Sequence, residues 1–192
     1  MQRSKLCSVL LAALLPVVVM FQGHAGPASS TITVHVHKSG LFSALGHEHT
    51  VTAPIARSRL DTKARTVEIV VDAKQMKVVD EDASAKDRAE IQATMLGPSV
   101  LDTAKFPEIR FHSSHVEEIG GNRYRVRGRL DLHGLTKDLS FEVSRNVEGV
   151  YEGRTRLKQT DFGIQPVSAG GGTVKVKDEL EIEFHIRGED GK

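Results

Sequence analysis

The chain has 192 residues, of which 39% are hydrophobic, 27% charged and 5% aromatic, with no Trp and a single Cys. This length suits one domain or at most two small ones. Because 26 Lys and Arg residues are balanced by 25 Asp and Glu residues, the chain lacks the strongly basic character that binding to a phosphate backbone requires, and we expect no nucleic-acid partner.

The N-terminal segment has the three parts of a secretory signal peptide. Arg3 and Lys5 precede an apolar run over residues 6–21, and the small residues of Gly23-His24-Ala25-Gly26 follow it. We therefore predict a signal peptide over residues 1–25, with cleavage after Ala25. A membrane anchor is the alternative, and it is disfavoured because the apolar run is shorter than the ~20 residues that span a bilayer.

Cleavage of this segment would remove the single cysteine, Cys7. The remaining domain, residues 26–192, is therefore expected to fold without a disulfide, by burial of its core alone. No other segment approaches membrane-spanning length, so we do not expect an integral membrane protein. In a Gram-negative bacterium the expected compartment is the periplasm.

From Thr31 onward, apolar and polar residues alternate with a period of two, which is the pattern of strands that bury one face. The clearest case is residues 123–132, where Tyr124, Val126 and Leu130 share one face and four arginines share the other. Short links containing Gly or Asn, at residues 120–122, 133–134 and 146–149, are typical of turns between antiparallel neighbours. The predicted strands are residues 31–38, 49–61, 67–73, 108–118, 123–132, 139–143, 150–159 and 180–187. Eight one-sided strands favour an antiparallel barrel or sandwich, and therefore an all-β fold.

Residues 84–96 break this alternation and predict a short helix. Ser84 and Asp87 fit a capping box at its start, and Gly97-Pro98 would end it. We expect this helical insertion to plug or cover one end of the barrel. No internal repeat or linker indicates a second domain.

Asp178 is an exception in the last predicted strand. It shares the parity of the apolar residues Val176 and Leu180, so it would point inward if the strand ran without interruption. Either it is a buried hydrogen-bonding anchor or a bulge at residues 177–178 turns it outward, and we favour the bulge.

Motifs of nucleophilic catalysis and of phosphate binding are absent from the sequence of residues 26–192. It has no Cys, no Gly-x-Ser-x-Gly elbow and no Walker-type loop. Gly170-Gly171-Gly172 is followed by neither Lys-Ser/Thr nor a helix start, so we interpret it as a hairpin loop. No pre-organised acid–base pair is apparent, and we expect a protein that is not an enzyme.

Histidine is the one reactive residue type in excess. His35 and His37, and likewise His47 and His49, place two imidazoles on one side of an extended chain, a spacing that suits two ligands of one metal. The alternative function is therefore a Zn, Cu or haem site that uses His47 and His49. Further ligands would come from some of five other histidines, which are His35, His37, His112, His115 and His133. The competing interpretation places these imidazoles on the polar face of a strand and in a hydrogen-bonded turn.

Four motifs follow one another with ordered spacing between residues 101 and 182. They are Leu101-Asp102-x-x-x-Phe106-Pro107-Glu108-Ile109-x-Phe111-x-Ser113, Tyr124-x-Val126-x-Gly128-x-Leu130-x-Leu132-x-Gly134-x-Thr136-Lys137, Asp161-Phe162-Gly163-Ile164 and Val176-x-Asp178-x-Leu180-x-Ile182. These motifs resemble those of the YceI-like family. The resemblance implies a lipocalin-like, eight-stranded antiparallel barrel that is exported to the periplasm. It also implies a long apolar tunnel that holds a polyisoprenoid or an isoprenoid quinone.

The candidate ligand contacts are large apolar residues on the inward faces of the predicted barrel. Each of them can equally be core packing, because a solid core and a tunnel share the same alternation. The low aromatic content fits a barrel with an open interior. The expected ligand is an isoprenoid lipid or quinone, no cofactor is required, and a homodimer is left open. The candidates for lipid binding are Phe106, Ile109, Phe111, Leu130, Leu139, Phe141, Phe162, Ile182 and Phe184.

Overall fold

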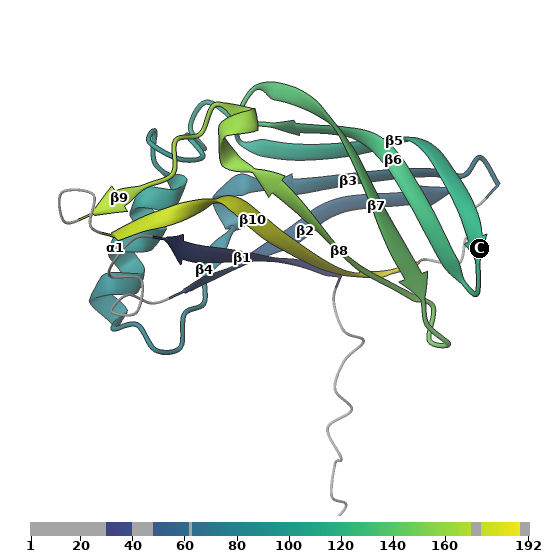
Figure 1. Cartoon of the computed structure of the whole chain (residues 1–192), viewed down its shortest axis with the longest axis horizontal. Helices are drawn as coiled ribbons and strands as arrows, with labels where there is room; N and C mark the ends of the chain where they lie inside the picture. The colour runs from purple at the N-terminus through teal and green to yellow at the C-terminus, as the bar shows by residue number, and fades with distance from the viewer. Residues whose placement is uncertain (1–29, 40–47, 62, 170–173, 189–192) are drawn as a thin grey trace, which may run out of the picture.

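The computed structural model describes residues 30–39, 48–61, 63–169 and 174–188. Antiparallel strands curve into a barrel, and one α-helix lies at one end of it (Figure 1). The helical segments are η2 (Ala73–Gln75), α1 (Ala85–Leu96) and η3 (Gln159–Phe162). The strands are β1 (Thr31–Ser39), β2 (His49–Asp61), β3 (Thr66–Asp72), β4 (Lys77–Val78), β5 (Glu108–Gly120), β6 (Arg123–Leu132), β7 (Leu135–Arg145), β8 (Val150–Lys158), β9 (Ser168–Ala169) and β10 (Val174–Arg187).

Eight long strands close on themselves. Their order is β1-β10-β8-β7-β6-β5-β3-β2, and pairing of β1 with β2 completes the ring. The two-residue strands β4 and β9 pair with β2 and β10 and are not members of this ring. The predicted eight-stranded antiparallel barrel with one short helix is therefore confirmed.

The tight turns form where the sequence predicted them. His133 and Gly134, between β6 and β7, have φ of 52° and 76°, the left-handed conformation of a two-residue hairpin turn. Gly120, the last residue of β5, and Gly121 and Asn122, which follow it before β6, also have positive φ. These links keep the connected strands adjacent and fix their register.

The helix predicted over residues 84–96 forms as α1, and Ser84 is its N-cap. The Ser84 hydroxyl accepts a hydrogen bond from the backbone N–H of Asp87 at 3.1 Å, and the C-terminal cap is Gly97. Ile91, Met95 and Leu96 are half-buried and pack against the core of the barrel. The helix therefore covers one end of the barrel, as the insertion was predicted to do.

The strand directions define two different ends. The end that carries α1, η3 and the β6–β7 turn is called the helix end, and it lies on the left of Figure 1. The opposite end carries the β2–β3, β5–β6 and β7–β8 turns and is called the turn end. No helix in the described part of the chain is long and apolar enough to cross a membrane.

Candidate functional site

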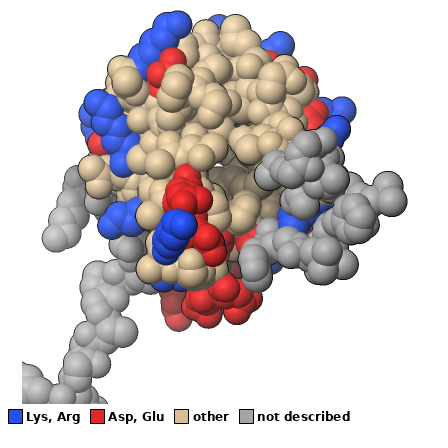
Figure 2. Space-filling view, turned by 90° about the vertical axis from the view of Figure 1, so that its left-hand side faces the viewer, with Lys and Arg blue, Asp and Glu red and all other residues tan. Residues whose placement is uncertain are grey.

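The barrel encloses a cavity of about 400 Å³ that extends between its two ends. Every one of the eight long strands contributes side chains to its wall. Figure 2, which looks at the helix end, shows a hollow in the middle of that end. A cavity of this size is typical of sites that bind small molecules, and the cavity is the candidate functional site.

Seven of the nine residues predicted as ligand contacts line this cavity. The alternation within each strand places them there, because their strands run without a register shift at these positions. Contact of these residues with a ligand stays a prediction. The seven are Ile109, Phe111, Leu130, Leu139, Phe141, Ile182 and Phe184.

The other two predicted contacts, Phe106 and Phe162, pack at the helix end and are not part of the cavity wall. Both residues contact His133. The ring centroids of His133 and Phe106 lie 4.8 Å apart, and the His133 Nδ1 donates a hydrogen bond to the carbonyl oxygen of Phe162 at 3.1 Å. Phe162 is 3% exposed. The two rings therefore help to pack the β6–β7 turn against η3.

Three of the lining rings form a row across the inner wall. The ring centroid of Phe141 lies 5.3 Å from that of Phe111 and 5.0 Å from that of Phe184. Gly128 and Gly153 make room for the outer two rings, because a Cβ at either glycine would lie 2.6 Å from the Phe111 or Phe184 ring. The phenyl groups therefore lie against the strands and leave the middle of the barrel open.

The wall changes character along the barrel. Toward the helix end it is apolar, with Met76, Leu101 and Leu132 among its residues, and in the middle Thr155 adds one hydroxyl. At the turn end the wall includes polar and charged side chains, which are Asp61, Arg65, Thr66, Glu118, Tyr124 and Tyr151. A ligand in this cavity would meet hydrogen-bonding groups at the turn end.

Asp61 is already engaged within the β2–β3 turn. Its carboxylate accepts hydrogen bonds from the backbone N–H groups of Ala64 at 2.7 Å and Lys63 at 2.9 Å. These hydrogen bonds, that of Ala64 foremost, lower the pKa of Asp61. The carboxylate is therefore ionised near neutral pH and stabilises the turn.

Several lining residues were missed by the sequence analysis although the signal for them was present. Val34, Val126 and Leu180 have the inward parity of their strands but were not among the predicted contacts. No pattern in the sequence marked Asp61, Arg65 or Glu118, because strand ends and turns carry no reliable inward or outward parity.

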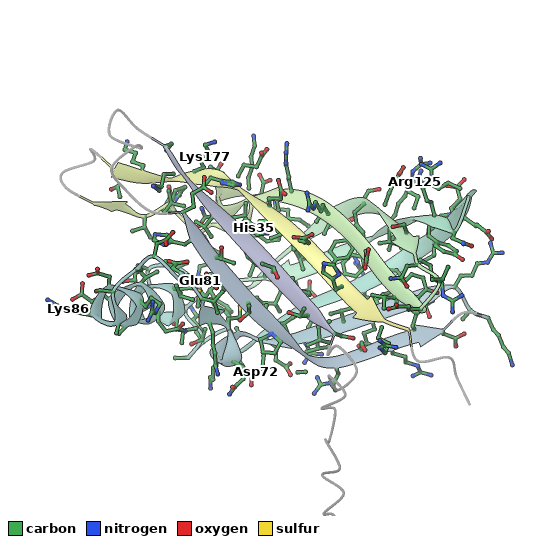
Figure 3. The ribbon with its side chains drawn as sticks, turned by 90° about the horizontal axis from the view of Figure 1, so that it is seen from below. His35, Asp72, Glu81, Lys86, Arg125 and Lys177 are labelled. Carbon is green, nitrogen blue, oxygen red and sulfur yellow. The ribbon has the colours of Figure 1, made fainter. Side chains whose placement is uncertain are left out.

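Three of the histidines predicted as possible metal ligands pair with carboxylates. His35 contacts Glu183 at 3.4 Å, His37 contacts Glu48 at 2.9 Å and His49 contacts Asp80 at 2.6 Å. His35 lies on the outer surface of β1 (Figure 3). His112 and His115 are exposed on β5, and His133 packs at the helix end as described above.

Among the described residues, no group of three or more His, Cys, Asp or Glu side chains is arranged to hold a metal ion. His47, half of the pair proposed as the alternative metal site, lies outside the described residues.

Side-chain hydrogen bonds at the helix end hold α1 and the loop before it against the strands. The Gln92 amide accepts from the backbone N–H of Val78 and donates to the carbonyl of Met76, both at 2.8 Å, so it acts as a pairing partner for β4. Asp80, whose side chain is 3% exposed, accepts from His49 Nδ1 and, at 2.7 Å, from the backbone N–H of Thr50. These contacts hold α1 and the loop before it over the end of the cavity.

Asp178 holds η3 in place at the same end. Its carboxylate accepts from the backbone N–H and the hydroxyl of Thr160, at 2.9 and 2.7 Å, and these bonds lower its pKa. The β1–β10 register shifts between Val36 and Lys38, opposite this part of β10. Asp178 therefore combines the two alternatives of the sequence analysis: it is a hydrogen-bonding anchor, half-buried, next to an irregularity in the pairing.

The model of the YceI-like domain matches residues 24–188 of the chain. A UPF0312 protein of Pseudomonas putida (strain W619) is 31% identical over 111 residues, which are 53% of this chain and 55% of that protein. A UPF0312 protein of Vibrio campbellii is 30% identical over 128 residues, which are 62% of this chain and 64% of that protein. The chain thus spans between half and two thirds of the length of these curated relatives.

Solved structures share the barrel. BcnA of Burkholderia cenocepacia has a TM-score of 0.62 at 18% identity, covering 81% of this chain and 94% of that one. A polyisoprenoid binding domain from Saccharophagus degradans, implicated in plant cell wall breakdown, has a TM-score of 0.52 at 13% identity, covering 81% and 91%. At these identities the likeness establishes a common fold.

Proposed function

The chain belongs to the YceI-like domain family, and from this premise we propose that it is an exported lipid-binding protein. It sequesters or carries an isoprenoid chain, either a polyisoprenoid or an isoprenoid quinone, inside its barrel. The observation that carries this proposal is the apolar cavity of about 400 Å³ that runs between the two ends of the barrel.

The chemistry of the wall fits a hydrocarbon chain. Burial contributes about 0.8 kcal/mol for each CH₂ group taken out of water, so affinity does not require directional contacts. The row of Phe111, Phe141 and Phe184 provides broad apolar contact surfaces at the middle of the barrel. The polar groups of the turn end are suited to the hydroxyl or carbonyl group at one end of such a ligand.

Two comparisons support the ligand class. The domain from Saccharophagus degradans, described as polyisoprenoid binding, has the same fold. The motifs between Leu101 and Ile182 that resemble the YceI-like family fall within the matched region, residues 24–188.

We propose binding in preference to catalysis, with no cofactor beyond the bound lipid. The charged groups that line the cavity, Asp61, Arg65 and Glu118, all belong to its turn end. A chain bound along the apolar part of the wall would meet the lone hydroxyl of Thr155 and no acid–base pair from the described residues.

We further propose that the protein works in the periplasm. The support is the predicted signal peptide of residues 1–25, which lies outside the described residues. N-terminal sequencing of the protein recovered from its own cells tests this point. A mature chain that begins at Gly26 in the periplasmic fraction is expected, and an intact Met1 would contradict it.

The ligand is tested by extracting the protein purified from its own host with organic solvent and analysing the extract by mass spectrometry. We expect one isoprenoid chain, as a polyisoprenoid or an isoprenoid quinone, in an amount close to one per protein. Straight-chain fatty acids in that amount would contradict the isoprenoid, and an extract without lipid would contradict the proposed function.

A bulky side chain introduced into the cavity tests whether the extracted lipid is bound there. Leu139 lines the cavity, whereas its neighbour Ser140 is exposed on the outer face of β7. We expect Leu139→Trp to lose most of the extracted lipid and Ser140→Trp to keep it, with an overpacking cost of about 1–3 kcal/mol for the inward variant. Ile182→Trp, on β10, serves as a second inward variant should the first unfold. Equal lipid content in the inward and outward variants would mean that the extracted lipid is not bound in this cavity.

A further inference from the structure

Four arginines lie in a row on the outer face of β6. Arg123, Arg125, Arg127 and Arg129 occupy alternate positions of one strand, so their side chains all point away from the cavity. Neighbouring members of the row are about 7 Å apart along the strand. Arg123, Arg127 and Arg129 are exposed, and Arg125, labelled in Figure 3, is half-buried.

Two carboxylates on the strands beside this row both form ion pairs with Arg125. Glu117 on β5 and Glu142 on β7 both contact Arg125, at 3.7 and 2.9 Å. The pairing therefore neutralises Arg125 and leaves the other members of the row without these two carboxylates.

The remaining three arginines have few acidic neighbours in the register. Arg127 lies opposite His115 and Ser140, and Arg123 lies opposite Ser144. Arg129 lies opposite His112 and Asp138, yet no ion pair joins it to Asp138. Within the described residues, none of these three guanidinium groups forms an ion pair, so they keep their charge toward solvent.

A second pair of arginines with the same spacing has the opposite surroundings. Arg154 and Arg156 lie on the outer face of β8 and are equally exposed. Arg154 contacts Glu183 at 3.0 Å, and the hydrogen bond with Glu183 raises the pKa of Arg154. Arg156 contacts Glu181 at 3.5 Å and Glu179 at 3.7 Å. The positive charge of β8 is thus cancelled by β10, whereas that of β6 is not.

We propose that Arg123, Arg127 and Arg129 form a docking surface for the phosphate groups of an anionic phospholipid bilayer. Guanidinium groups bind phosphate through two parallel hydrogen bonds, and a row along one strand presents them to a flat surface and not to a pocket. A negatively charged membrane attracts exposed basic side chains within about 10 Å of its surface. This surface would bring the barrel to a membrane side-on, whichever lipid the cavity holds.

Vesicle binding tests the proposal. Full-length mature protein is mixed with sedimenting vesicles of phosphatidylcholine, with or without one quarter phosphatidylglycerol, at low and at high salt. We expect binding only to the vesicles with phosphatidylglycerol, and its loss at high salt. Arg127→Gln combined with Arg129→Gln should weaken the binding by about 25-fold, because each arginine contributes about fivefold.

The matched control is Arg154→Gln combined with Arg156→Gln. It removes the same two charges at the same spacing, but from arginines that are already paired, and it should bind vesicles nearly as the unchanged protein does. Equal weakening in the two double variants would overturn the proposal, since net charge alone would then explain binding. Binding to polyglutamate in place of vesicles, or equal binding to both kinds of vesicle, would also overturn it. Lipid extracted from each variant should be unchanged, which separates this surface from the proposed function of the cavity.

Discussion

The two ends of the barrel are held together by different kinds of contact. At the helix end, polar side chains distant in sequence fasten covering segments to the strands: Gln92 to β4, Asp80 to the start of β2 and Asp178 to η3. At the turn end, Asp61 and Asn146 close their turns by accepting from backbone N–H groups two to four positions away. The helix end therefore depends on tertiary contacts, and the turn end depends on local turn chemistry.

This difference has a consequence for stability and for the cavity. A lost side chain at the helix end leaves buried donors without acceptors and loosens the segments that cover the cavity. A lost side chain at the turn end exposes groups that water can satisfy. We therefore expect substitutions at the helix end to be the more costly.

The largest effect is expected for Asp80→Ala. This change leaves the backbone N–H of Thr50 and the imidazole of His49 without the buried carboxylate that both contact. We expect the free energy of unfolding in urea to fall by about 2–3 kcal/mol. Asp82→Ala, at an exposed position two residues away, is the control and should stay within about 0.5 kcal/mol of the unchanged protein. Similar losses in the two variants would refute a special role for the Asp80 contacts.

A smaller and pH-dependent effect is expected for Asp178→Asn, which removes the charge that Thr160 binds. Because the pKa of Asp178 is lowered in the folded protein, its carboxylate stabilises the fold above the pKa of the unfolded chain. This stabilisation is lost as the pH falls through the folded pKa.

The measurement for Asp178→Asn is urea unfolding at several pH values. We expect a loss of about 1 kcal/mol at neutral pH, since the site is partly exposed. The difference from the unchanged protein should shrink below about pH 4, where the carboxyl group becomes protonated in the unfolded chain and then in the folded one. A difference that stays constant down to acidic pH would contradict the assignment to the charge.

The smallest effect is expected at the turn end, for Asn146→Ala. The Asn146 side-chain oxygen accepts from the backbone N–H groups of Glu148 and Val150, both at 3.0 Å. Its loss should cost about 0.5 kcal/mol in thermal or urea unfolding, because the backbone hydrogen bond from the N–H of Asn146 to the carbonyl of Val150 remains. A cost as large as that of Asp80→Ala would remove the proposed difference between the two ends.

The inward faces of the strands were predictable because alternation is a local property. Ile109, Phe111 and Leu130 line the cavity as their parity indicated. Phe106 and Phe162 had the same apolar character, but they precede and follow strands, where parity no longer fixes direction. Their position at the helix end depends on how η3 packs against the β6–β7 turn.

The pairing of the histidines was not predictable from their spacing. His35 contacts Glu183, which is 148 positions away in the sequence, and His49 contacts Asp80, 31 positions away. The two-residue spacing of His35 and His37 places both on one face of β1, but their partners come from other strands and loops. The environment of each imidazole was therefore fixed by the sheet and not by the motif.

The sequence by itself determined the strands, their inward faces, the tight turns and the capped helix, because each of these follows from residues within one strand or one turn. Only the tertiary structure decided that β1 pairs with both β2 and β10, which closes the barrel. It also decided that the Phe111 and Phe184 rings lie over Gly128 and Gly153 and leave a cavity. These features depend on the register between strands far apart in the chain, and alternation along a single strand does not specify that register.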